Sequence, residues 1–242
     1  MIGQVITEHL LSLQNSAEAK HLARFFKTGK GEYGFGDKFL GIRVPMTRSI
    51  VKEYKDLVTV GDCSFLIKSF WHEIRLAGFL LLVEKYRVAK KLKNFAEAKE
   101  IVDLYIELIP YGNNWDLVDL VCGAILGDWL VDNHIDRVLL EKFAEYDSSL
   151  WHQRVAIVST LPLIKAGQYN ETISISTKFL THKHDLIHKA TGWMLREMGK
   201  RGGYDKLIAF LDKYVQVMPR TTLRYSIEHF PEELRRYYLK MH

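Results

Sequence analysis

Apolar residues recur along almost the whole chain at intervals of three and four positions, the period of an α-helix that is half-buried against its neighbours. The strict alternation of apolar and polar residues that marks a half-buried strand is almost absent. Asparagine and serine pairs stand before two of the apolar runs, where helix N-caps are expected. The pattern therefore predicts an all-α protein. The predicted helices are Gln4–Leu13, Ala17–Phe26, Met46–Lys55, Ser64–Phe70, His72–Lys90, Ala96–Ile109, Trp115–Val131, Arg137–Tyr146, Trp151–Lys165, Glu171–Leu180, Asp185–Lys200, Tyr204–Val215, Thr221–His229 and Glu232–Met241.

A weak internal repeat runs through the chain. The segment 69–77 (SFWHEIRLA) resembles the segment 148–156 (SSLWHQRVA), and a third copy can be followed through 187–190. Repeated helix pairs of about 40 residues are typical of HEAT-like solenoids, in which stacked pairs form an α-α superhelix with a concave surface. We therefore predict one continuous domain, 1–242, with a concave basic groove.

One long irregular stretch interrupts the helices. Residues 28–38 contain four glycines, which permit turns with positive φ, together with lysines that favour an anionic neighbour. Just after it, Gly41 allows a tight approach of backbones and Pro45 suits the first turn of the next helix.

Composition narrows the class of protein. Hydrophobic residues make up 48% of the 242 positions, enough to bury a sizeable core. Two cysteines, Cys63 and Cys122, form no CxxC pair, and neither a signal peptide nor a run of eighteen apolar residues is present, so we expect a cytosolic protein with no membrane contact. A net charge of +5 and a pI near 9.0 favour a polyanionic partner.

Trp115 and Asp119 are spaced i, i+4 on a predicted helix, so an indole and a carboxylate project from the same side. That pair suits a cationic target, because an indole face attracts cations and a carboxylate stabilises developing positive charge. The structural alternatives are a core aromatic for Trp115 and a solvated helix face for Asp119. For Asp116 we prefer the structural alternative, a charge that complements the helix dipole.

A second group of candidates gathers on the helix 185–200. Lys189, Trp193, Arg196 and Lys200 fall on one stripe, where the cations can follow phosphates and the indole can meet a base or sugar. The alternative is a solvated lysine-rich face around a buried tryptophan. Arg154 lies near a helix start, where an anionic partner or a salt bridge would offset the unfavourable dipole.

Other residues and patterns carry less chemistry. His72 and His152 recur beside tryptophans in the repeat and are interpreted as packing or capping residues. No Walker A, GxGxxG, HExxH, serine-hydrolase or zinc-deaminase signature occurs, so we expect neither a cofactor nor a metal.

Four motifs, in order over most of the chain, resemble the AlkD-like family of DNA alkylation repair proteins. They are FLGIRVP at 39–45, NNWDLVD at 113–119, WHQR at 151–154 and ATGWMLRE at 190–197. The resemblance implies a HEAT-like repeat glycosylase that excises cationic alkylpurines, such as 3-methyladenine and 7-methylguanine, from duplex DNA without metal or cofactor. The family's concave-face residues correspond here to Trp115, Asp119, Arg154 and Trp193.

Together with this resemblance, the sequence predicts a monomeric DNA-alkylpurine N-glycosylase that acts on duplex DNA in the bacterial cytosol or nucleoid. Trp115 and Trp193 are expected to contact the lesion nucleotide, and Asp119 is expected to stabilise the sugar cation and position water. The basic residues Arg154, Lys189, Arg196 and Lys200 are expected to hold the DNA backbone. Two alternatives stay open: a DNA-structure binder without base excision, and a HEAT-type scaffold whose basic stripe meets an acidic protein.

Overall fold

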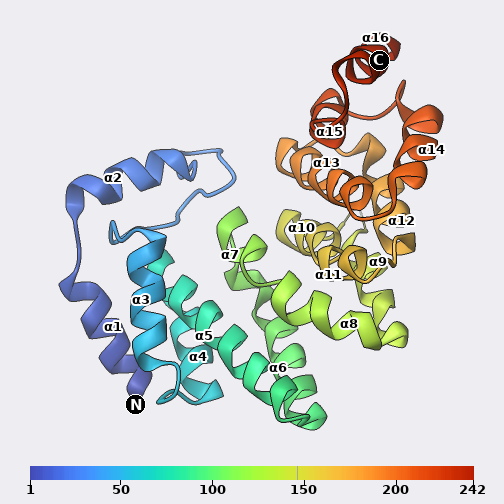
Figure 1. The fold of residues 1–242 in the computed structure, drawn as a ribbon. Helices are drawn as coiled ribbons and strands as arrows, with labels where there is room; N and C mark the ends of the chain where they lie inside the picture. Colours follow the sequence, from blue (N-terminus) through green and yellow to red (C-terminus); the bar gives the residue numbers. More distant parts are fainter. Residues whose placement is uncertain (146) are drawn as a thin grey trace. The chain divides into compact units, whose positions relative to one another are not determined.

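The computed structural model describes residues 1–145 and 147–242, and within these ranges the chain is all-α, with one isolated bridge between Lys38 and Trp71 (Figure 1). The chain divides into two compact units, 1–121 and 122–242, and each is described by itself. The predicted fold class is confirmed. The prediction of a single 1–242 repeat domain stays a prediction.

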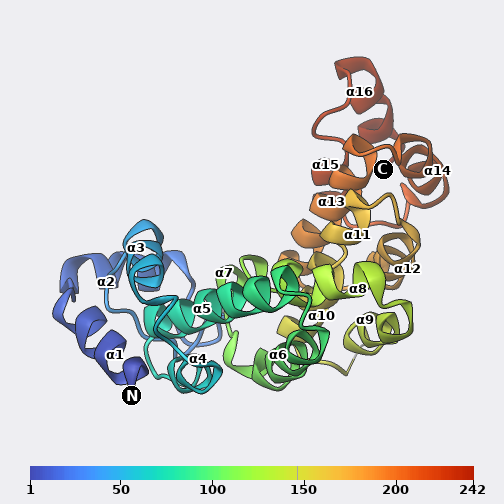
Figure 2. The same ribbon diagram turned by 60° about the horizontal axis from the view of Figure 1, so that its bottom comes forward.

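The first unit is built around α5, a twenty-residue helix that is buried along most of its length. Helices α3, α4 and α6 pack against it (Figures 1 and 2). The elements are α1 (Ile2–Ser12), α2 (Ser16–Phe25), α3 (Val44–Tyr54), α4 (Val60–Ile67), α5 (His72–Lys91), α6 (Phe95–Leu108), a 3-10 turn (Ile109–Tyr111) and α7 (Trp115–Asp119). Asn114 is the N-cap of α7, its side chain accepting from the Trp115 amide, as the sequence predicted.

The second unit is centred on α13, against which α10, α12, α14 and α15 pack. A β-carbon at Gly192 would collide with Thr222 and Tyr225, so glycine is needed for α13 and α15 to approach. The elements are a π-helical turn (Gly123–Gly127), α8 (Asp128–Asp132), a 3-10 turn (His134–Arg137), α9 (Val138–Phe143), α10 (Leu150–Val158), α11 (Leu161–Lys165), α12 (Asn170–Lys178), a 3-10 turn (Phe179–Thr181), α13 (Asp185–Lys200), α14 (Tyr204–Tyr214), α15 (Arg220–Ser226) and α16 (Glu232–Met241).

The predicted bounds of α13 and α16 are confirmed, but two long predicted helices are wrong. The helix predicted at 115–131 is interrupted by the π-helical turn, in which the Gly127 amide donates to the Cys122 carbonyl, and Gly127 lies against the Ser159 backbone. The helix predicted at 151–165 breaks at Ser159, because Pro162 opens a new helix, α11.

Two further boundaries differ from the predictions. α4 begins before the predicted Ser64, because Thr59 and Asp62 form a capping box that starts the helix at Val60. The helix predicted at 137–146 ends at Phe143, and Tyr146 lies outside the described residues. Within the described part of the chain, no helix has the length and apolar character needed to span a bilayer.

Candidate functional site

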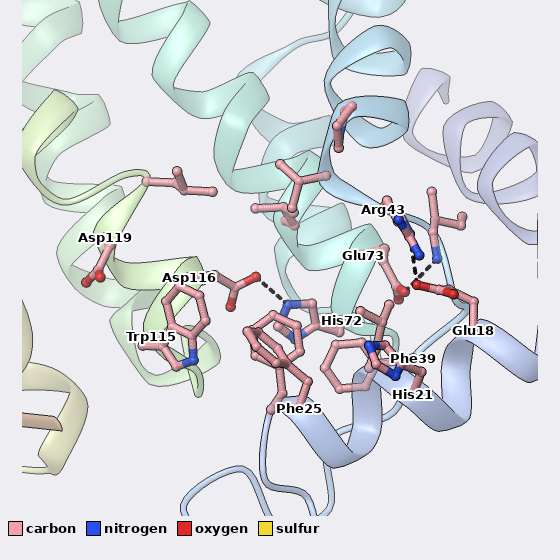
Figure 3. A pocket seen from close by; sticks show the side chains of 17 residues that line it. Glu18, His21, Phe25, Phe39, Arg43, His72, Glu73, Trp115, Asp116 and Asp119 are labelled. Carbon is pink, nitrogen blue, oxygen red and sulfur yellow. Dashed lines mark hydrogen bonds and ion pairs between the residues drawn. The ribbon is translucent and has the colours of Figure 1, made fainter. Parts of the chain in front are cut away.

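A cavity of about 530 Å³ in the first unit is lined by α2, the 39–45 segment, the start of α5 and α7 (Figure 3). Its lining residues are Glu18, His21, Leu22, Phe25, Phe26, Phe39, Ile42, Arg43, Val44, Pro45, His72, Glu73, Leu76, Trp115, Asp116, Asp119 and Leu120. Concave sites of this size with a mostly apolar lining and a few polar groups are typical of ligand-binding sites. Trp115 and Asp119, predicted from their i, i+4 spacing to share one side of a helix, both line this cavity.

Aromatic rings form one wall of the cavity. Phe26 stacks on Phe39 with centroids 5.1 Å apart, and the Trp115 indole lies 5.3 Å from Phe26. Phe25, 57% exposed, lies edge-on to the Trp115 ring with centroids 6.0 Å apart. Phe39 in turn stacks on His72 at 4.3 Å. The cavity therefore offers ring faces to a planar ligand.

Next to this wall lies a buried network of charged groups, which consists of Asp37, His72, Arg75 and Asp116. His72 sits between two carboxylates, with Nδ1 2.7 Å from Asp37 and Nε2 2.9 Å from Asp116. Asp37 also accepts from the Arg75 guanidinium, which donates at 2.9 Å to Asn113. These contacts tie the 28–38 loop and α5 to the start of α7, and so fix the helix that carries Trp115 and Asp119.

The same end of α5 holds the 39–45 segment. The buried Glu73 carboxylate accepts from the amides of Leu40, Gly41 and Ile42 at 2.8 to 3.1 Å. Gly41 has φ +86° and its missing side chain makes room for the Asn15 backbone, while Pro45 lies in the first turn of α3. Both predictions for Gly41 and Pro45 are confirmed, and the segment delivers Phe39 to the cavity.

The buried charged network shifts the pKa values of His72 and Asp37. Burial alone would lower the pKa of His72, but the charges and hydrogen bonds of Asp116 and Asp37 outweigh it and raise that pKa to about 9. For Asp37, burial acts to raise the pKa, but hydrogen bonds and charges from His72 and Arg75 lower it overall. The imidazole is therefore charged at neutral pH.

This raised pKa predicts a pH-dependent stability. His72 holds its proton more tightly in the folded chain than in the unfolded chain, where its pKa is about 6.5. Its contribution to the stability of the fold is therefore complete below about pH 6.5 and is lost as the pH rises through about 9. We expect the free energy of unfolding, measured by urea titration, to fall between about pH 7 and pH 10. His72→Gln should be less stable at neutral pH and should flatten that dependence; a decline of equal steepness in the variant would contradict the assignment.

Asp116 and Asp119 occupy different positions around Trp115. Asp116 is 4% exposed and points to His72, whereas Asp119 is partly exposed and points away from it (Figure 3). Asp116 was interpreted from sequence as a charge at the start of a helix. Asp116 does lie in the first turn of α7. Its role is not limited to complementing the helix dipole, because its side chain is also bonded to the buried imidazole of His72.

The stripe predicted on α13 belongs to the second unit. Lys189, Trp193 and Arg196 are partly exposed and Lys200 is exposed, while most other positions on the helix are buried. Each cation has a carboxylate neighbour. Lys189 contacts Asp185 at 2.7 Å, Arg196 contacts Glu228, and Lys200 lies 3.7 Å from Glu197. The shared face is as predicted, and a phosphate would have to compete with these carboxylates.

Arg154 lies deeper than a surface cation would. It is 5% exposed, and its guanidinium donates at 2.6 Å to the carbonyl of Leu186 at the start of α13. This bond joins α10 to α13 within the second unit. Arg154 is therefore assigned a structural contact, and its predicted role in holding a DNA backbone stays a prediction. Roles for Trp115, Asp119 and Trp193 likewise stay predictions.

Sequence reasoning missed Asp37 and Glu73 and did not connect His72 with Asp116. Asp37 lies in a glycine-rich loop, where an acidic residue is ordinarily solvated, and nothing local marks its burial. His72 was interpreted as a packing residue, and its buried place between two carboxylates agrees with a structural role. In the part of the chain that the structure describes, no cluster of three or more potential metal ligands is found.

Comparisons with known proteins find one family and one solved structure that are similar to this chain. Residues 6–230 match the family described as "DNA alkylation repair enzyme". A solved structure, the "Predicted DNA alkylation repair enzyme from Enterococcus faecalis", matches with a TM-score of 0.70 at 16% identity, covering 90% of this chain and 97% of that one. At that identity the match shows a shared fold. The search of curated proteins finds no match to this sequence.

Proposed function

The chain belongs to the DNA alkylation repair enzyme family, and from this premise we propose that it is a DNA glycosylase that removes cationic N-alkylated purines from duplex DNA. The observation that carries the proposal is the presence of Trp115 and Asp119, one helical turn apart, on the wall of one aromatic cavity. Family membership supports DNA as the substrate, and an indole beside a carboxylate in one cavity supports the excision of a charged base.

The proposed reaction is hydrolysis of the bond between C1′ of the sugar and the base nitrogen. The electron pair of that bond leaves with the base and neutralises its positive charge, water adds to C1′, and one proton of that water is released. Because a charged purine is already a good leaving group, the site needs no strong general acid. The sugar passes through an oxocarbenium-like state, which a nearby carboxylate stabilises.

Each residue has a role in this proposal. The Trp115 indole attracts the charged base through its ring face. Asp119, on the side of α7 away from His72, stabilises the sugar cation and positions water. Trp193 contacts the lesion nucleotide, and Arg154, Lys189, Arg196 and Lys200 hold the DNA backbone. No metal or cofactor is required by these steps.

A release assay tests this function. Methylated duplex DNA is incubated with the protein, and free 7-methylguanine and 3-methyladenine are quantified against the spontaneous rate. Release above that rate supports the glycosylase. Duplex binding without release of a base would exclude the glycosylase and favour a DNA-structure binder. A weak dependence of duplex binding on salt would instead favour the protein scaffold, because phosphate contacts make affinity fall steeply with salt.

The stripe on α13 gives a separate expectation for binding. Arg196→Ala and Lys200→Ala should each weaken duplex binding for all sequences and lower the salt slope by about one per lost phosphate contact. Glu228→Gln is the matched control, because it removes the carboxylate that competes for Arg196 and should strengthen binding. Salt titrations of duplex affinity measure both effects, and an unchanged slope in the two cation variants would remove the stripe from the interface.

A further inference from the structure

Arg154 is bound to a short histidine-rich turn at the start of α13, residues 182–186, which we call the histidine turn. The Arg154 guanidinium donates to the Leu186 carbonyl at 2.6 Å, and the amide of that leucine donates to Nδ1 of His184 at 3.1 Å. His184 is the N-cap of α13. Its own amide donates to Nδ1 of His182 at 3.0 Å. The carbonyl that binds Arg154 is therefore positioned by two imidazoles in succession.

These hydrogen bonds fix the protonation state of both imidazoles. A backbone amide can only donate, so an Nδ1 atom that accepts from one carries no proton. On the other side of His182, Nε2 lies 2.9 Å from Oε1 of Gln153, whose NH₂ group donates at 2.9 Å to the Glu145 carbonyl. Nε2 of His182 is therefore the donor, and both rings are neutral. A second proton, on Nδ1 of either ring, would face an N–H group and break a bond that forms the turn.

The surroundings of the two rings favour their neutral forms. Burial lowers the pKa of both rings, and for His182 the charges of His188 and His184 lower it further. At the N-cap imidazole, the charges of His188 and Arg154 also lower the pKa, and that of Asp185 opposes them. Both rings therefore bind a second proton less tightly in the folded chain than at the unfolded pKa of about 6.5. Their contribution to stability is present above that pH and is lost as the pH falls through the lowered values.

Other charged groups face the histidine turn from the elements packed around it. Glu145 and Lys178 line the cleft beside the turn and pair with each other at 2.8 Å. Asp185 pairs with Lys189 at 2.7 Å and accepts from the hydroxyl of Thr221, on α15, at 3.3 Å. The negative charge of both carboxylates is partly neutralised by these lysines, which reduces the stabilisation that they can give to a protonated ring.

We propose that the histidine turn makes DNA binding sensitive to pH: below about pH 6, protonation of His182 and His184 opens the turn, and Arg154 loses the position in which it holds the DNA backbone. The inference rests on the proposed function, in which Arg154 contacts that backbone. His182 and His184 are positioning residues, because they act on the guanidinium through the Leu186 carbonyl. Duplex binding should therefore weaken as the pH falls.

Titration of the full chain with an unmodified duplex, at about pH 7.5 and about pH 5.5 and at constant ionic strength, tests this dependence. Protonation of histidines elsewhere on the surface adds positive charge and strengthens the binding of a polyanion, so the sign of the effect is diagnostic. We expect the wild type to bind the duplex about tenfold more weakly at the lower pH. Affinity that is equal or higher at the lower pH would overturn the proposal.

His184→Asn separates the titration of the ring from its capping role. Asparagine is a good N-cap residue, so its side-chain oxygen can accept the Leu186 amide, and it does not titrate. Because one of the two rings remains, the loss of affinity at the lower pH should shrink to about threefold, with affinity at neutral pH kept. His229→Asn makes the same change at an exposed histidine of the second unit and should keep the wild-type dependence. A loss in folded His184→Asn as large as in the wild type would overturn the proposal.

Hydrogen exchange followed by mass spectrometry tests the turn without DNA. After correction for the intrinsic exchange rate, the protection of residues 182–190 should fall about tenfold between the two pH values, whereas α14 should keep its protection. Constant protection of 182–190, or an equal loss in α14, would overturn the proposal whatever the base-release assay shows. Opening of the turn at the lower pH, in a preparation that releases no base at neutral pH, would overturn the glycosylase alone.

Discussion

Asp119→Asn is expected to lower the single-turnover rate of 7-methylguanine release by about a hundredfold or more, with affinity for lesion-bearing duplex unchanged or slightly improved. The carboxylate acts on a sugar cation that exists only near the transition state, so its loss affects the rate. In the ground state a negative charge near phosphates disfavours binding. Single-turnover release gives the rate, and duplex titration gives the affinity.

Asp103→Asn is the control for this experiment. It makes the same chemical change in the same unit, at a side chain that is 52% exposed and paired with Lys99 on the surface of α6. A solvated pair of this kind contributes little, so the rate should stay within about twofold of wild type. Equal release rates in the wild type and Asp119→Asn would remove Asp119 from the chemistry, and a larger loss in a folded Asp116→Asn protein would move the role to Asp116.

Asp37→Ala is expected to destabilise the first unit by about 3–5 kcal/mol, the effect of removing one partner from a buried ion pair. The change leaves the imidazolium of His72 and the guanidinium of Arg75 buried together without the carboxylate between them. Because the buried charged network fixes the start of α7, the rate of base release should fall together with the stability of the first unit. Urea-induced unfolding followed by circular dichroism measures the loss.

Glu84→Ala supplies the comparison. Glu84 pairs with Arg87 on α5, but the Arg87 side chain is 62% exposed, and surface pairs contribute about 0–1 kcal/mol. If Asp37→Ala lowers the free energy of unfolding no more than Glu84→Ala does, the buried charged network does not hold the cavity wall.

Helical periodicity was sufficient to predict the fold class and most of the helices. It located α13 and α16 to the residue, because each has an apolar stripe and clear flanking signals. It failed at 115–131 and 151–165, where tertiary packing decides the backbone. The glycines of the first segment permit a π-helical turn against Ser159, and Pro162 restarts a helix within the second. An apolar run looks the same whether or not its helix is broken.

The candidate site was predicted only in part. The spacing of Trp115 and Asp119 placed them together, since it depends on helix geometry alone. The contacts of His72 could not be found in this way, because His72 is 44 residues from Asp116 and 35 residues from Asp37 in the sequence, and only tertiary packing brings it between them. The glycines of the 28–38 loop predicted its positive φ values, as seen at Gly31 and Gly36, but not the burial of its aspartate.

Cleavage of the glycosidic bond of a charged purine is the activity that we propose for this protein. The most direct measurement uses a duplex with one 7-methylguanine at a defined position, excess protein, and quantification of both products. We expect free base and abasic site to appear in equal amounts, much faster than by spontaneous depurination, and we expect Asp119→Asn to suppress both together. Intact lesion-bearing DNA bound by folded wild-type protein, with neither product above the spontaneous rate, would contradict it.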